Sequence, residues 1–290
     1  MKRKLLSCLA LLLGMFLVIG SVTAEAAEGE IDYAKRLITV KGMGAAPPMP
    51  NPAQARMLAR RAAVADAYRQ LAETVKGVQV DSETSVEMYM VKSDIVRTKV
   101  SAMIQGAQVV AEQAFDGGYE VTMVVPMFGV QGSVAAAVLT PPPVVEAFPE
   151  PAPEVIPSMP ADSNTTGSAT VAVVGNGPSA AIGGYTGLII DCRGLGLQPV
   201  MSPVVKNDRG VKLYGHENLN YDLVIRDGMA DYANNESMLA RAGAKPLIVK
   251  AIRVEDHNAN PVISAEDGNR VLIENGSSGF LNKTAVVFLY

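Results

Sequence analysis

The sequence has few of the residues on which disulfide-stabilised and metal-binding proteins depend. Its 290 residues include two cysteines, two histidines and no tryptophan. Removal of an N-terminal leader would leave Cys192 as the only cysteine, which excludes an intramolecular disulfide. One cysteine and two distant histidines, His216 and His257, form no recognisable metal site. Stability must therefore come from cores of aliphatic side chains or from partners.

Basic residues are also too few and too scattered for a nucleic-acid-binding protein. The chain has 25 Lys and Arg against 29 Asp and Glu, a formal net charge of -4. Neutralising a phosphate backbone requires clustered Lys and Arg, and no basic run follows the first few residues. We therefore expect no nucleic-acid partner.

The first 26 residues have the organisation of a signal peptide. A basic start, residues 1–4, precedes an apolar run over residues 5–20, and residues 22–27 are mostly small, as signal peptidase requires. Cleavage after Ala26 would leave an exported chain with a net charge of -6, since three cations and one anion are lost. We expect a periplasmic or envelope-associated protein.

Two other interpretations of the leader stay open. It could be retained as a membrane anchor, or it could carry a lipid on Cys8, which follows Leu5, Leu6 and Ser7. Lipid attachment is disfavoured because the apolar stretch of a lipoprotein leader precedes its cysteine, whereas here it follows Cys8. No later apolar run reaches the roughly 20 residues of a membrane-spanning helix.

A proline-rich stretch divides the remaining chain in two. Eight prolines between residues 141 and 160 exclude a helix or a central strand and favour extended polyproline II structure. Residues 161–184 continue with Ser, Thr, Asn and Gly, a flexible composition. We predict a linker over residues 130–184, long enough to hold a domain of residues 31–129 apart from a domain of residues 185–290.

The first domain is predicted to be α+β. A strand at residues 37–40 enters a Gly-Met-Gly loop at residues 42–44, and Asn51 then caps a long helix that ends at Gly77. The helix is expected to bury an apolar face of Met57, Val64, Tyr68, Leu71 and Val75. Residues 78–90 are predicted to be extended, Ser93 to cap a second helix ending at Gly106, and residues 116–118 to form a hairpin turn.

These features together resemble a known family. They are the Gly-Met-Gly loop, the helical block of residues 55–71, the second helix ending in Ile104-Gln105-Gly106, and the hairpin arm of residues 121–126. The combination is similar to the N-terminal domain of flagellar assembly protein T and to the related small envelope lipoproteins of diderm bacteria, over residues 37–129. The resemblance implies an exported, non-catalytic module, which in flagellar assembly protein T belongs to a ring around the basal body.

The second domain shows shorter patterns that are also typical of an α+β fold. Strands are predicted at residues 186–191, 200–205, 211–214, 247–254 and 284–290, and helices at residues 221–226, 236–241 and 264–274. Ser264 and Asp267 resemble a capping box. The predicted architecture is two small domains with helices packed on mostly antiparallel sheets.

Candidate sites are sparse. His216-Glu217 lacks the second histidine, at position 220, of a zinc-binding helix, and Gly194 and Gly196 lack the third glycine of a dinucleotide motif. We therefore predict no catalytic residues, metal or cofactor. Two candidate surfaces stay open. The first is a polar cluster of Asp191, Cys192 and Arg193, which could instead have only a structural role. The second is a partner-binding face of Arg56, Arg60 and Arg61, which could instead be an ordinary solvated surface.

These patterns favour a non-enzymatic envelope protein with an assembly or scaffolding role, with the flagellum as the sharpest form of the hypothesis. Its expected partners are envelope or flagellar basal-body proteins, or further copies of itself, with no membrane span after cleavage. The alternative is a ligand-binding or hydrolytic C-terminal domain carried by an envelope-targeting module. That alternative requires Asp191, Cys192 and Arg193 to meet His216 or His257 in one pocket.

Overall fold

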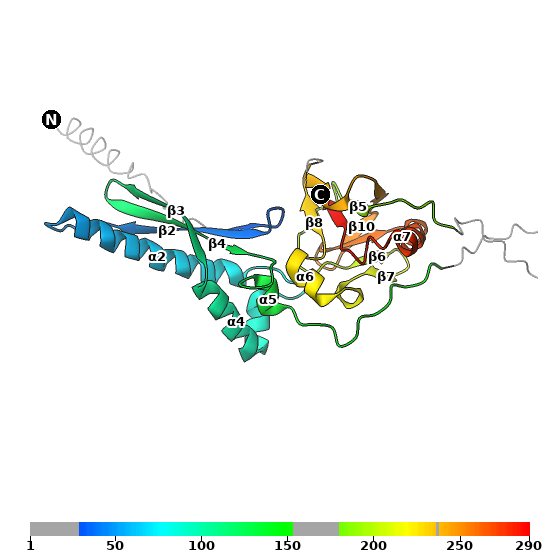
Figure 1. The fold of residues 1–290 in the computed structure, drawn as a ribbon, viewed down its shortest axis with the longest axis horizontal. Helices are drawn as coiled ribbons and strands as arrows, with labels where there is room; N and C mark the ends of the chain where they lie inside the picture. Colours follow the sequence, from blue (N-terminus) through cyan, green and yellow to red (C-terminus); the bar gives the residue numbers. More distant parts are fainter. Residues whose placement is uncertain (1–28, 153–179, 236–237) are drawn as a thin grey trace, which may run out of the picture.

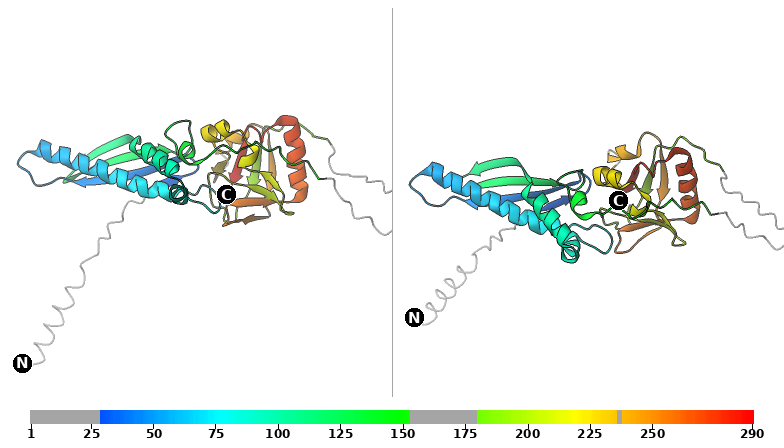
Figure 2. Two further views of the ribbon diagram at one scale, coloured as in Figure 1. Left: turned by 90° about the horizontal axis from the view of Figure 1, so that it is seen from below. Right: turned by 60° about the horizontal axis from the view of Figure 1, so that its bottom comes forward.

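The computed structural model describes residues 29–152, 180–235 and 238–290, and it contains two α+β domains. The N-terminal domain extends as an arm from one side of the rounder C-terminal domain (Figures 1 and 2). The predicted signal peptide lies outside the described residues. The α+β class expected from the sequence is confirmed.

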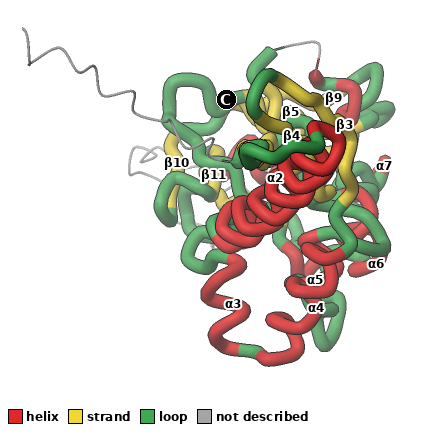
Figure 3. Tube along the Cα trace, turned by 90° about the vertical axis from the view of Figure 1, so that its left-hand side faces the viewer, coloured by secondary structure: helices red, strands yellow, loops and turns green. Residues whose placement is uncertain are grey.

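The N-terminal domain is an antiparallel sheet covered on one face by a long helix. Its strand order is β1-β2-β4-β3, and three helices follow β2. The elements are β1 (Glu30–Asp32), β2 (Leu37–Ala45), α2 (Pro52–Lys76), α3 (Val86–Lys92), α4 (Asp94–Gln105), β3 (Gln108–Phe115) and β4 (Gly118–Pro126). Viewed along the arm, α3 and α4 project to one side of α2 (Figure 3).

Helix α2 begins where the sequence predicts, but it buries a different face. The Asn51 side chain accepts hydrogen bonds from the amides of Ala53 and Gln54. The buried side chains are Ala55, Ala59, Ala63, Ala67, Leu71 and Val75. The predicted face is therefore wrong in its first half, where Met57 is 62% exposed.

Two glycines of β2 explain this choice of face. Gly42 and Gly44 lie within the strand, so the predicted Gly-Met-Gly loop is wrong. A Cβ atom at Gly42 would lie 2.1 Å from the Ala63 carbonyl oxygen, and one at Gly44 would lie 2.1 Å from the Ala59 carbonyl oxygen. The alanine stripe of α2 therefore packs directly on the strand backbone, closer than larger side chains would allow.

The remaining predictions for this domain are partly confirmed. Residues 78–90 are extended only at their start, where Gln79 and Ser85 form an isolated bridge, because Ser85 caps α3. Ser93 caps α4 as predicted. The hairpin turn is also confirmed, with Gly117 at a φ of 80°. Val121, Met123 and Val125 of β4 point into the core as the two-residue period predicts.

The C-terminal domain contains two four-stranded sheets in its described part. One, in the order β8-β12-β5-β9, is parallel throughout, and the other, in the order β10-β11-β6-β7, is mixed. Its elements are β5 (Gly187–Asp191), β6 (Val205–Asn207), β7 (Lys212–Tyr214), η1 (His216–Asn218), α6 (Tyr221–Asp227), β8 (Asp231–Ala233), η3 (Ala240–Ala242), β9 (Pro246–Lys250), β10 (Arg253–Glu255), β11 (Asn260–Ile263), α7 (Ala265–Ser278) and β12 (Val286–Leu289).

The parallel sheet departs from the mostly antiparallel expectation, which the N-terminal sheet follows. All four residues of β12 are buried, as parallel strands covered on both faces require. The predicted strand at 247–254 is two strands, β9 and β10, which lie in different sheets. The helices α6 and α7 confirm the predictions, with Ser264 capping α7. The predicted helix at 236–241 falls partly outside the described residues, and its end overlaps the short turn η3.

The stretch predicted as a linker differs from a simple spacer. It contains the helix α5 (Val134–Val138), most of which is buried. The chain then runs along the C-terminal domain, where the Glu146 amide donates to the Glu217 carbonyl at 2.8 Å and Phe148 stacks on Tyr214 at 6.4 Å. The first part of the stretch therefore joins the domains instead of separating them. Residues 153–179 lie outside the described part of the chain.

Glu274, fully buried on α7, holds the chain where it re-enters the C-terminal domain. Its carboxylate accepts from the amides of Ile182 at 2.9 Å and Gly183 at 2.8 Å, and it pairs with Arg270. Burial alone would raise the pKa of Glu274, but the two amides and the guanidinium hold the pKa below its usual value. The folded state therefore favours the ionised form.

Glu274→Gln is expected to destabilise the protein by about 1–3 kcal/mol at pH 7, because buried charge-assisted hydrogen bonds are lost. A carboxyl group whose pKa is lower in the folded than in the unfolded protein adds stability at pH values above its unfolded pKa of 4.5. This stability disappears as the pH falls through the pKa of the folded state. Thermal denaturation at pH 7 and pH 3 should therefore show a smaller difference from wild type at pH 3. Glu266→Gln, on an exposed position of α7, is the control. A difference that widens in acid contradicts the prediction.

Candidate functional site

Backbone hydrogen bonds, a shared apolar core and ion pairs join the two domains at a seam. The segment that follows α2 pairs with the C-terminal domain through its backbone. The amide of Met201 donates to the Gln79 carbonyl at 3.1 Å, and the amide of Ser202 donates to the Val80 carbonyl at 2.7 Å. Backbone bonding of this kind fixes the position of one domain on the other.

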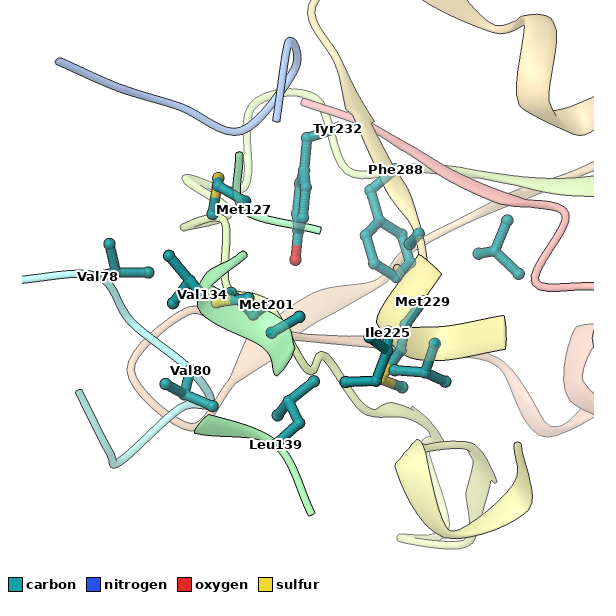
Figure 4. Close-up of a cluster of buried hydrophobic side chains, with 14 of the residues drawn as sticks. Val78, Val80, Met127, Val134, Leu139, Met201, Ile225, Met229, Tyr232 and Phe288 are labelled. Atoms are coloured by element: carbon teal, nitrogen blue, oxygen red, sulfur yellow. The ribbon is translucent and has the colours of Figure 1, made fainter. Parts of the chain in front are cut away.

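A continuous apolar core crosses the seam. Buried side chains from both domains meet there, as Figure 4 shows. The N-terminal half and α5 supply Val78, Val80, Met127, Val134 and Leu139, and the C-terminal domain supplies Met201, Ile225, Met229, Tyr232 and Phe288. Each such side chain contributes about 1.5–3 kcal/mol when fully buried. The two domains therefore do not form separate cores.

Asp231 also bridges the two domains by charge. Arg36, in the turn between β1 and β2, donates to the Asp231 carboxylate at 3.0 Å and to the Asp227 carbonyl at 2.9 Å. Arg241 of the C-terminal domain also pairs with Asp231, at 2.9 Å. The Arg241 side chain is only 9% exposed, and its guanidinium also donates to the carbonyls of Asp227 and Gly228. One carboxylate thus links two cations from different domains.

A cavity of about 550 Å³ opens at the same seam. Tyr33, Gln79, Asp81 and Glu83 line it from the N-terminal domain, and Gln198, Pro199, Val200, His257 and Ala259 line it from the C-terminal domain. His257 lies in a turn of three consecutive left-handed residues, with φ values of 51°, 57° and 64° at residues 256–258. An ion pair of 2.6 Å between Lys206 and Asp256 holds this turn.

Two polar side chains of the cavity, Asp81 and Tyr33, already have protein partners. Asp81 accepts from the amides of Glu83 and Thr84, at 2.9 and 2.8 Å, and from the Tyr89 hydroxyl. The Tyr33 hydroxyl bonds to the backbone of Gln79, and burial raises the pKa of Tyr33 to about 12. Asp81 and Tyr33 therefore help to hold the joint between the domains.

The predicted polar cluster does not meet either histidine in this cavity. Asp191 pairs with Arg193 at 2.7 Å, and the hydrogen bond from Arg193 lowers the pKa of Asp191. Cys192 is buried beside them. The described residues that line the cavity include His257 but none of these three. His216 stacks on Tyr221 instead, and burial lowers its pKa.

Cys192 is expected to resist alkylation in the folded protein. The thiolate is the reactive form, and burial raises the pKa of Cys192 to about 12. Treatment with iodoacetamide at pH 8, followed by mass spectrometry of the Cys192 peptide, should show labelling at least about tenfold slower than in denaturant. Equal rates in the folded and denatured protein would contradict this and would revive a nucleophilic role.

The three arginines of the predicted partner face differ in their surroundings. Arg60 forms a bidentate ion pair with Glu112 of β3, with its Nε 2.8 Å from one carboxylate oxygen. The Tyr119 hydroxyl donates to the same carboxylate. Arg56 and Arg61 are exposed. Arg60 therefore acts within the domain, connecting the flank of α2 to the edge of the sheet.

Two kinds of feature are missing from the described part of the chain. Across residues 29–152, 180–235 and 238–290, none of the helices combines the length and the apolar character needed to cross a bilayer. Within the same ranges, no three metal-ligating side chains come together.

Sequence reasoning missed the residues that join the domains. Arg36 and Asp231 are 195 positions apart, so no local pattern relates them. A weak signal existed in the run from Val134 to Leu139, which is more apolar than a linker needs. Its burial, with α5 packed on α4 and with Val134 and Leu139 in the core at the seam, accounts for that composition.

Comparison with known families assigns a relative to each domain. Residues 39–126 match the family model described as LPP20 lipoprotein, which supports the predicted resemblance to small envelope lipoproteins. Residues 187–290 match the model of the second domain of Treponema pallidum Tp0624. No curated protein matches the chain. The resemblance to flagellar assembly protein T stays a prediction. The chain thus combines an N-terminal domain similar to LPP20 lipoproteins with a C-terminal domain similar to the second domain of Tp0624.

Proposed function

We propose that this chain is an exported, envelope-associated protein that acts in assembly or scaffolding and not in catalysis. The observation that carries the proposal is the seam, where a shared apolar core and the Asp231 bridge join two domains into one unit. A rigid unit of this kind holds two different surfaces at a fixed separation, as a scaffold requires. The match of residues 39–126 to the LPP20 lipoproteins supports the envelope location.

Association with the flagellar basal body is the sharper form of the proposal. It rests on the resemblance of the N-terminal domain to flagellar assembly protein T, a protein whose ring surrounds the basal body. Asp81 and Tyr33 in the seam cavity support a structural role, because both bind the protein's own backbone.

Fractionation of cells that produce the full chain tests the proposal. We expect the protein in the periplasmic or envelope fraction, and recovery in the cytosol would overturn the envelope location. Motility of a deletion strain tests the sharper form, because full motility would contradict a flagellar role. A hydrolytic activity that survives purification to homogeneity would contradict the non-catalytic assignment.

A further inference from the structure

Strand β3 forms a long, open edge of the N-terminal sheet. In the strand order β1-β2-β4-β3 it pairs only with β4, and all eight of its residues are exposed. The opposite edge is the three-residue strand β1. Proteins usually shorten, cover or charge such an edge, because its unpaired amides and carbonyls bind other strands. A bulge between Val109 and Ala111 interrupts β3 near its start, so regular pairing is available over residues 111–115.

The helix side of β3 is also uncovered. Val109 lies opposite Met123 and Ala114 lies opposite Tyr119, so both point toward the side of the sheet on which α2 packs. Helix α2 packs on β2 and β4, and it leaves Val109 39% exposed where Met123 is fully buried. The sheet therefore extends one strand, β3, beyond the part that α2 covers.

The flank of α2 that faces β3 is apolar and partly exposed. The Arg60 to Glu112 pair and the hydrogen bond from Tyr68 to the Gln105 carbonyl identify this flank. Met57 and Val64 lie on the same flank, because residues three and four apart share a helix face. The sequence thus shows an apolar face at Met57, Val64 and Tyr68 of which the domain buries Val64 and Tyr68 only in part and leaves Met57 exposed.

The charge of the edge allows two copies to approach each other. Glu112 is the only charged residue of β3, and Arg60 of the same chain neutralises it. Two β3 strands therefore bring no unpaired like charges together. A strongly charged strand of another protein would find no unpaired opposite charge on β3 with which to interact.

We propose that β3 pairs antiparallel with β3 of a second copy of this chain. The proposal deepens the scaffolding function, on which it rests, by naming a partner. Pairing centred on Gln113 joins two four-stranded sheets into one continuous sheet, with an α2 helix from each copy on the same side. The exposed flank of each α2, including Met57, then lies over the uncovered residues of the joined strands.

Sedimentation of the purified full chain over a range of concentrations tests the pairing. We expect a reversible dimer, and Ala111→Lys combined with Gln113→Lys is expected to raise its dissociation constant at least about tenfold, because like charges meet across the two strands. Both positions are exposed, so the fold should tolerate the change. The matched control, Ala244→Lys with Gln131→Lys, makes the same substitutions at exposed loop positions outside the N-terminal sheet.

A cysteine at the proposed symmetry axis tests whether the strand that pairs with β3 is β3 of a second copy. Residues directly opposite in an antiparallel pair have Cα atoms about 4.5–5.5 Å apart, within disulfide reach. Gln113→Cys should therefore give a covalent dimer on mild oxidation in cells, and Gln131→Cys should not. If the thermal stability of the lysine variant drops sharply, the cysteine variant decides the result instead.

Three results would overturn the pairing: a monomer at all concentrations, a dimer insensitive to the lysines, or a cross-link from Gln113→Cys to a different protein. Fractionation of the same variants separates this proposal from the general one. A monomer that still fractionates with the envelope would refute self-association alone, whereas a cytosolic protein would refute the envelope function whatever its oligomeric state.

Discussion

Gly42→Ala is expected to lower the stability of the N-terminal domain by at least about 3 kcal/mol, which corresponds to a fall in its melting temperature of roughly 10 °C or more. The added Cβ would lie 2.1 Å from the Ala63 carbonyl oxygen and 2.3 Å from the Ala67 nitrogen. Both are backbone atoms of α2, so no side-chain rotation relieves the overlap. The helix must move away from the sheet, and the whole alanine stripe then loses its contacts. Thermal denaturation monitored by circular dichroism measures the effect.

Gly77→Ala is the matched control for that substitution. Gly77 ends α2 with a φ of -75°, and an added Cβ there makes only an ordinary contact of 3.5 Å with Thr74. An alanine at a compatible backbone conformation is neutral or stabilises by about 0.4–1 kcal/mol, because it reduces the entropy of the unfolded chain. Equal melting temperatures for the two variants would show that α2 does not pack closely on β2.

Asp231→Asn is expected to destabilise the folded protein by about 2–4 kcal/mol, because it leaves the cation of Arg241 without its carboxylate partner in a nearly water-free site. Arg36 loses the same carboxylate and keeps the Asp227 carbonyl, so the N-terminal domain is less firmly held to the C-terminal one. The three backbone acceptors that remain around Arg241 keep the loss below that of a fully isolated charge. Urea denaturation measures the free energy of unfolding.

Asp222→Asn removes the same charge from an exposed position on α6 and serves as the control. Surface changes of this kind alter stability by about 0.5 kcal/mol at most. If the two variants unfold at the same urea concentration, the Asp231 bridge does not stabilise the seam. An Asp231→Asn variant that unfolds in two steps, where wild type unfolds in one, would show that the bridge couples the domains.

Helix ends could be predicted from the sequence because their causes are local. Asn51, Ser93 and Ser264 each bond to an amide two or three residues further along. The hairpin turn at Gly117 is local in the same way. Such signals depend on neighbours in the sequence, so no knowledge of the tertiary structure is needed to interpret them.

The buried face of α2 and the seam could not be predicted, because each depends on a distant partner. Periodicity selects Met57 as readily as Ala59, and only the glycines of β2 decide between them. The proline content of residues 130–184 correctly predicts that the described residues after Thr140, 141–152 and 180–184, form no helix. It does not show that Phe148 finds a stacking partner in Tyr214, which is 66 positions away. Composition indicates which backbone conformation a segment favours, but not which residues it contacts.

The two described ends beside residues 153–179 are attached to the same helix. Asn269 of α7 bonds to the backbone of Ala152, and Glu274, five residues further along α7, accepts from the amides of Ile182 and Gly183. A segment that departs from and returns to one helix does not determine how far apart the domains lie. Each doubling of a closed loop adds only about 0.6 kcal/mol to its closure entropy. Related chains can therefore differ widely in length here, and a reporter domain can be inserted here, without altering the joint between the two domains.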